Sequence, residues 1–98
     1  MQIKETSKTS ILIVEDELEI LNLLKNIFSK HFSRVYTATN GRAGLDIVKE
    51  SSPDIVLTDI LMPEISGTEL IVKMRSEGID TPVIIISSSR EREQMLKR

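Results

Sequence analysis

The chain has 98 residues, of which 40% are apolar and 29% charged, and its formal net charge is −2. These values are typical of one globular domain and exclude a strongly basic surface for nucleic acid or for a membrane. The sequence has no cysteine, which excludes disulfides and thiolate metal sites, and its longest uninterrupted apolar runs have four residues, too few for a membrane span or a signal peptide. We therefore expect a cytoplasmic domain that makes no direct contact with nucleic acid.

The first clear pattern is an apolar run that ends in acids. Residues 1–10 are polar and aperiodic, so we expect a disordered lead-in before a domain that covers residues 11–98. Residues 11–14 are all apolar, which is typical of a parallel strand covered on both faces, and Glu15 and Asp16 follow directly. A helix is then predicted over about residues 17–31, with Asp16 as its N-cap. Its apolar face is expected to contain Ile20, Leu21, Leu24, Ile27 and Phe28.

The alternation of strand and helix continues along the chain. Arg34–Ala38 is a short β-prone run. Asn40 then opens a predicted helix that runs to about residue 50, with Leu45 and Val48 on its apolar side. Ile55–Asp59 is the next apolar strand, and it too ends on a carboxylate.

The last part of the chain repeats the pattern once more. Ser66 and Glu69 stand at the spacing of a capping box and predict the start of a helix, which Gly78 is expected to close. Val83–Ile86 is a third apolar run. The charged residues 90–98 predict the beginning of a further helix.

Polar side chains gather where the three apolar strands end. Strands that alternate with helices predict right-handed βαβ units, a parallel sheet and helices on both of its faces, with ligands at the carboxyl ends of the strands. Glu15 and Asp16 follow the first apolar strand, Asp59 ends the second, and Ser87 follows the third. The sequence therefore predicts that three acids and a hydroxyl converge on one crevice.

Three neighbouring carboxylates require protons or a cation, because like charges at short distance repel. A hard divalent cation is the natural partner, since Mg²⁺ takes oxygen ligands and is usually held by one or two carboxylates together with phosphate oxygens. No histidine or cysteine stands near these acids in the sequence, which argues against zinc. The pattern indicates a site for Mg²⁺ and phosphate.

Three sequence blocks, in this order and at these separations, resemble the signature of response regulator receiver domains of two-component systems. They are residues 11–17, residues 54–63 together with Gly67, and residues 81–87. The resemblance covers the chain from Ile11 onward. It implies an α/β, flavodoxin-like, doubly wound parallel sheet of strand order 2-1-3-4, with the family's fifth strand and fifth helix missing.

The resemblance also implies a role for each matching residue. Asp59 would accept a phosphoryl group from a sensor histidine kinase or a phosphotransfer protein. Glu15, Asp16 and Asp59 would hold Mg²⁺ together with the backbone carbonyl of Leu61, and Ser87 would hydrogen-bond the phosphoryl group. Such a domain assists its own phosphorylation and is not a turnover enzyme.

The sequence departs from the family at its carboxyl end. The family has a lysine that pairs with the phosphoryl group, and an aromatic switch residue, on a fifth strand that would follow Arg98. Without that strand, we expect residues 83–86 to form an exposed apolar edge. The chain is then expected to be a fragment of a longer one, to pair as a homodimer through this edge, or to exchange elements between protomers.

Several alternatives remain open from the residues alone. Asp16 could serve only as a helix cap, and Glu15 could serve only to favour the helix dipole. The chain could be an interaction module that is never phosphorylated, or a non-signalling fragment. A phosphohydrolase with an aspartyl-phosphate intermediate requires an Asp-x-Asp pattern, whereas Asp59 precedes Ile60 and Leu61. A nucleotide-binding loop is excluded, because no Gly-x-Gly-x-x-Gly or Walker-type motif is present.

Overall fold

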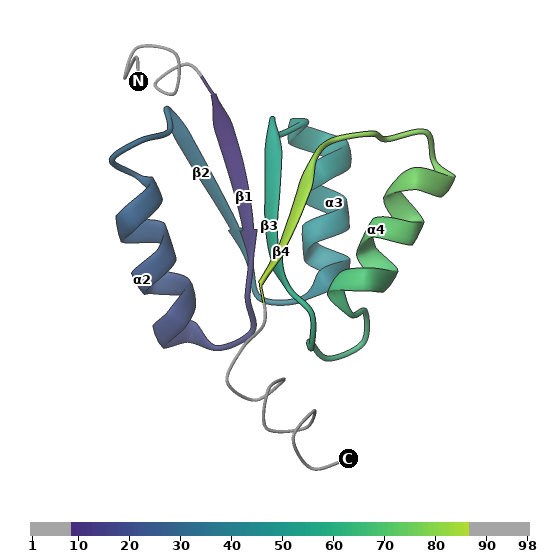
Figure 1. Ribbon diagram of the computed structural model, residues 1–98, viewed down its shortest axis with the longest axis horizontal. Coiled ribbons are helices and arrows are strands. Elements are labelled where there is room, and N and C mark those ends of the chain that lie inside the picture. The colour runs from purple at the N-terminus through teal and green to yellow at the C-terminus, as the bar shows by residue number, and fades with distance from the viewer. Residues whose placement is uncertain (1–8, 87–98) are drawn as a thin grey trace.

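The computed structural model describes residues 9–86, which form four strands and three helices in alternation (Figure 1). The strands are β1 (Ser10–Val14), β2 (Arg34–Ala38), β3 (Ile55–Asp59) and β4 (Val83–Ile86). The helices are α2 (Leu18–Phe28), α3 (Gly41–Ser51) and α4 (Gly67–Ser76). Ser87 and the predicted helix in residues 90–98 lie outside the described residues.

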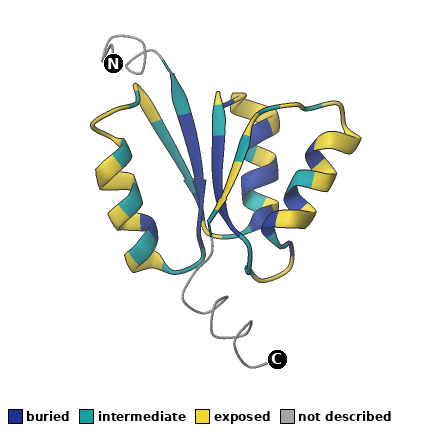
Figure 2. Cartoon of the chain, in the orientation of Figure 1, coloured by how far each residue is buried: buried dark blue, intermediate teal, exposed yellow. Residues whose placement is uncertain are grey.

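The strands form one parallel sheet in the order β2-β1-β3-β4, which confirms the predicted α/β fold and strand order. Helix α2 covers one face of the sheet, and α3 and α4 cover the other (Figure 1). Both central strands are therefore buried on both faces, as their apolar runs predicted (Figure 2). Among residues 9–86, no helix has the length and apolar character needed to cross a membrane.

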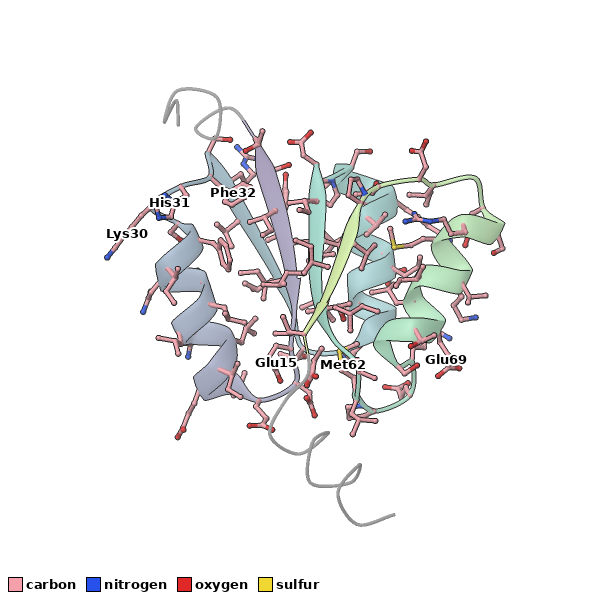
Figure 3. All side chains as sticks on the ribbon, viewed as in Figure 1. Glu15, Lys30, His31, Phe32, Met62 and Glu69 are labelled. Carbon is pink, nitrogen blue, oxygen red and sulfur yellow. The ribbon has the colours of Figure 1, made fainter. Side chains whose placement is uncertain are left out.

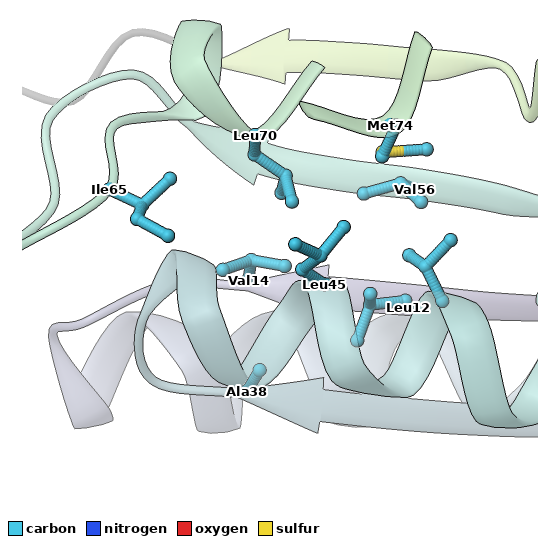
Figure 4. Packing of buried hydrophobic residues seen from close by; sticks show 9 residues of the cluster. Leu12, Val14, Ala38, Leu45, Val56, Ile65, Leu70 and Met74 are labelled. Atoms are coloured by element: carbon cyan, nitrogen blue, oxygen red, sulfur yellow. The ribbon is translucent and has the colours of Figure 1, made fainter. Parts of the chain in front are cut away.

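Alternate residues of the central strands contribute to two separate cores. Ile11, Ile13 and Leu57 pack with Leu21 of α2 on one face. On the other face a larger cluster joins the sheet to α3 and α4, and Figure 4 shows how its side chains interlock. Its buried members are Leu12, Val14, Ala38, Leu45, Val48, Val56, Ile65, Leu70 and Met74. These two clusters hold the strand ends, and therefore the acids, in a fixed arrangement.

Strand β1 begins one residue earlier than predicted, so assigning residue 10 to the disordered lead-in is wrong. Ser10 pairs with Arg34 of β2. The Ser10 N–H and hydroxyl donate to Oδ2 of Asp54, at 2.7 and 3.1 Å. Hydrogen bonds to Asp54, which is distant in the sequence, thus accompany the inclusion of Ser10 in the strand. The polarity of Ser10 alone could not reveal this.

Helix α2 is shorter than predicted, and the assignment of Asp16 as its N-cap is wrong. Glu17 is the N-cap residue and makes no side-chain capping bond; its own N–H donates to Oε2 of Glu15 at 3.0 Å. The helix ends at Phe28, before the expected residue 31, because the chain turns and Phe32 packs edge-on against Phe28, with ring centroids 5.8 Å apart. Ile27 is 45% exposed and lies outside the buried face on which it was expected.

Helices α3 and α4 follow the predicted signals closely. Asn40 caps α3 by accepting from the Ala43 N–H at 2.8 Å, and Leu45 and Val48 are buried. Ser66 and Glu69 form the predicted reciprocal capping box of α4. Strong local signals at both helix starts therefore agree with the tertiary structure.

Candidate metal and phosphoacceptor site

The structure brings Glu15, Asp16 and Asp59 together at the carboxyl ends of β1 and β3. One carboxylate oxygen of each lies within 4.8 Å of the others. Glu15 is 1% exposed and Asp59 is fully buried, whereas Asp16 is half-buried. Figure 3 shows Glu15 at the same end of the sheet as Met62, which belongs to the loop after β3. The cluster therefore lies where a ligand site of a parallel sheet is expected.

The position of each acid follows from its strand. Val14 pairs with Thr58 across β1 and β3, so the residues that follow each of them, Glu15 and Asp59, emerge side by side. On the other side of β3, Asp59 pairs with Ile86 of β4. Strand β3 thus lies between β1 and β4, and pairing on both sides places its last residue, Asp59, beside Glu15.

Burial has a direct electrostatic effect on Glu15. The pKa of this carboxyl rises from the ordinary 4.5 to about 7, first because burial removes water from the charged form. The negative charge of Asp59, a side-chain hydrogen bond with Asp16 and the negative charge of Asp16 raise it further. The hydrogen bond from the Glu17 N–H acts in the opposite direction. The cluster therefore holds a proton near neutral pH, and a cation bound there would have to displace it.

The donor set fits a hard divalent cation. All three side chains offer carboxylate oxygens, which suits Mg²⁺ better than softer metals. Two oxygens bound to one Mg²⁺ lie about 3–4 Å apart, because each is about 2.1 Å from the ion. Small side-chain rotations would bring oxygens that lie within 4.8 Å of one another to that spacing.

The loop between β3 and α4 borders the site and carries Leu61, which is half-buried. Thr58, fully buried, donates its hydroxyl to the Asp59 carbonyl at 3.0 Å and contacts the Met62 sulfur at 3.9 Å. The Gly67 N–H donates to the Ile60 carbonyl at 2.8 Å and closes the loop. Sequence reasoning did not select Thr58; its only signal was a polar residue inside an apolar strand. The predicted role of Ser87 falls outside the described residues and stays a prediction.

Comparison with known proteins gives a consistent result. The family described as response regulator receiver domain matches residues 11–98. The regulatory protein AtoC of Escherichia coli is 38% identical over 88 residues, which cover 90% of this chain but only 19% of AtoC. The solved N-terminal domain of an uncharacterized Wolinella succinogenes protein is 35% identical with a TM-score of 0.79, over 91% of this chain and 72% of that one. The receiver domain of a Francisella response regulator is 26% identical with a TM-score of 0.76, over 92% and 77%.

Proposed function

The chain belongs to the response regulator receiver domain family, and from this premise we propose that Asp59 accepts a phosphoryl group in a Mg²⁺-dependent reaction. The donor is a phosphohistidine of a sensor histidine kinase or of a phosphotransfer protein. The observation that carries the proposal is a fully buried carboxylate at a strand end with two further carboxylates within 4.8 Å. A buried cluster of like charges is costly to folding, so its presence favours a functional role over a structural one.

In the proposed reaction, a carboxylate oxygen of Asp59 attacks the phosphorus atom. The new O–P bond forms as the P–N bond to the donor imidazole breaks, and the imidazole nitrogen keeps the bonding electron pair. The strands on either side of β3 hold Asp59 in place, so the attacking oxygen is positioned before the donor arrives.

Glu15, Asp16, Asp59 and the backbone carbonyl of Leu61 are the proposed ligands of Mg²⁺. When bound, Mg²⁺ supplies positive charge that offsets the charge on the transferred phosphoryl oxygens. Glu15 has to give up its proton to act as a ligand, and its raised pKa places this step near neutral pH. The three acids therefore serve two purposes, holding the cation and supplying the nucleophile.

Ser87 is proposed to hydrogen-bond the phosphoryl group. It follows Ile86 in the sequence, and Ile86 pairs with Asp59 across β3 and β4. The chain thus acts as a signalling module that is modified once per signal, rather than as a turnover enzyme. We place it in the cytoplasm, where ATP is available to the kinases that supply the phosphoryl group.

The direct test is incubation with acetyl phosphate and Mg²⁺, followed by intact mass spectrometry. We expect a mass gain of one phosphoryl group that disappears in Asp59→Asn and in the presence of a chelator. Asp46→Asn removes an exposed acid of α3 and is the matched control, expected to be labelled like the wild type. Failure of the wild type to take up phosphate would favour the alternative of an interaction module that is never phosphorylated.

A second proposal concerns the β4 edge of the sheet, along which we propose that two copies associate as a homodimer. Within the described sheet, β4 neighbours only β3, and Ile84 and Ile85 of β4 are 50% and 38% exposed. An apolar edge strand is a template for pairing with another chain. Sedimentation should show a concentration-dependent dimer that Ile84→Lys disrupts. Val72→Lys, a change at a 62% exposed position of α4, should leave the dimer intact.

A further inference from the structure

Two helices that face the site begin with glycine. Gly41 is the first residue of α3, and Gly67 is the first residue of α4. Neither needs the conformational freedom of glycine, because among the described glycines only Gly78 has a positive φ. Alanine is also the better helix former. Another reason for glycine is therefore required at both positions, and the surrounding atoms supply it.

At Gly67 the reason is direct contact with the phosphoacceptor's backbone. A Cβ atom at this position would overlap the Asp59 carbonyl oxygen and would lie 3.2 Å from the Asp59 carbonyl carbon and 3.3 Å from the Ile60 Cα. These are backbone atoms of the strand end, which cannot move aside as a flexible side chain can. Helix α4 therefore begins in contact with the backbone of Asp59, the proposed phosphoacceptor.

Gly41 makes the equivalent contact at the other end of the same loop. A Cβ there would lie 2.6 Å from the Ile65 carbonyl oxygen, 2.8 Å from its Cβ and 2.9 Å from its Cγ2. Ile65 is 5% exposed and lies at one end of the core cluster in Figure 4, so it cannot turn away into solvent. The first residue of α3 therefore packs closely against Ile65, in the loop that leads to α4.

The segment between these two contacts, residues 60–66, is short and constrained. Glu64 adopts a left-handed backbone conformation with φ 67°, which a non-glycine residue keeps only when its surroundings enforce it. Leu61 lies in the same segment, two residues after Asp59. The contacts of Gly67 with Asp59 and Ile60, and of Gly41 with Ile65, thus flank both of these residues.

We propose that Gly41 and Gly67 are positioning residues of the metal site. By lacking side chains, they allow α3 and α4 to hold residues 60–66 against the end of β3, which places the Leu61 carbonyl and Asp59 for one cation. This inference rests on the proposed Mg²⁺ site and identifies two residues that act on it without touching the ion.

The test is Mg²⁺ binding to the 98-residue chain by isothermal titration calorimetry, with thermal unfolding measured in parallel. Gly67→Ala should weaken Mg²⁺ binding about 10- to 100-fold, the range expected when support behind metal ligands is lost. Gly78→Ala is the matched control, because it makes the same change beyond the other end of α4. Its φ of 76° disfavours alanine, but no atom lies within 4 Å of the new Cβ. It should lower the melting temperature and leave Mg²⁺ affinity unchanged.

Gly41→Ala gives an independent reading, because it displaces Ile65 without touching Asp59. It should also weaken Mg²⁺ binding, and it decides the question if Gly67→Ala does not fold. Wild-type Mg²⁺ affinity in a folded Gly67→Ala variant overturns the positioning role. If Gly67→Ala does not fold, wild-type Mg²⁺ affinity in Gly41→Ala overturns it. An equal loss of affinity in Gly78→Ala also overturns it, because the effect would then follow stability alone. Absence of Mg²⁺ binding by the wild type overturns the proposed metal site itself, and the positioning role with it.

Discussion

The two ends of the sheet use carboxylates in opposite ways. At the amino end, Asp54 is exposed and accepts hydrogen bonds from the Ser10 N–H and hydroxyl, at 2.7 and 3.1 Å. At the carboxyl end, Glu15 and Asp59 are buried and face one another and Asp16. The acid at the first end supports the fold, whereas at the second end the negative charges of Asp59 and Asp16 disfavour the ionised form of Glu15. The difference indicates that the clustered acids lower the stability of the folded chain when Glu15 is ionised, an arrangement that is common at functional sites.

The largest expected effect is the pH dependence that Glu15 gives to stability. The folded chain keeps this proton up to about pH 7, while the unfolded chain loses it near 4.5. The stability contributed by Glu15 is therefore fully present below pH 4.5 and is lost as pH rises through 7, by roughly 3 kcal/mol in the absence of divalent cations. Urea unfolding of the wild type and Glu15→Gln at several pH values would measure it.

Glu15→Gln should be more stable than the wild type at pH 8 and similar to it at pH 4.5. If the variant is less stable at both pH values, the two ends of the sheet do not differ in the proposed way. Asp54→Asn, at the amino end, is the matched change and should show no gain at pH 8.

Mg²⁺ binding should offset the loss of stability that ionised Glu15 causes at the carboxyl end of the sheet. At ten times its dissociation constant, a ligand that binds only the folded chain stabilises it by about 1.4 kcal/mol. We expect this gain at pH 8 and a smaller one at pH 5, where Glu15 keeps its proton. Thermal unfolding with and without Mg²⁺ measures it, and Asp59→Asn should remove most of it. An equal gain in that variant would assign the effect to non-specific ion binding.

At the amino end of the sheet, removing an acid should lower the stability of the folded chain. Asp54→Ala should destabilise the chain by about 1 kcal/mol, because Ser10 loses the acceptor of its two hydrogen bonds. Denaturant unfolding measures the loss, with Asp46→Ala as a control for removing an exposed acid. A neutral result for Asp54→Ala would mean that water replaces the carboxylate without cost.

The smallest effect is expected from an ion pair between two helix ends. Lys49 and Glu77 lie 2.8 Å apart at the end of α3 and just beyond α4, and their side chains are 44% and 43% exposed. Water screens such a pair, so Lys49→Met should cost about 0.5 kcal/mol or less. A double-mutant cycle with Glu77→Gln isolates the pair. A coupling energy between Lys49 and Glu77 larger than the loss of about 1 kcal/mol expected for Asp54→Ala would reverse the expected order of the two effects.

Much of the fold could be predicted because its signals are local. Apolar runs identified β1, β3 and β4, and the capping box of Ser66 and Glu69 identified the start of α4. The convergence of Glu15, Asp16 and Asp59 followed from parallel topology, since every strand of such a sheet presents its carboxyl end at the same edge. The cluster of these three acids was therefore predictable before any distance was known.

The errors occurred where a side-chain hydrogen bond or the packed surface changes the local preference. Ser10 belongs to β1, where its N–H donates a hydrogen bond to Asp54. The Glu17 N–H donates to the Glu15 carboxylate, and Glu17, not Asp16, is the N-cap of α2. Ile27 fits the apolar period of α2 but is 45% exposed and does not belong to the core between α2 and the sheet. The first outcome depends on a contact between segments far apart in the sequence, the second on a short-range hydrogen bond at a buried acid, and the third on packing.

By itself, the sequence determined the order of elements, the parallel sheet and the acids at its carboxyl edge, because periodicity and strand ends are properties of short segments. Only the tertiary structure decided how closely those acids approach, how far burial raises the pKa of Glu15, and why helices α3 and α4 begin with glycine. Distance, loss of water and steric overlap arise between segments, and they exist only once the strands and helices have packed.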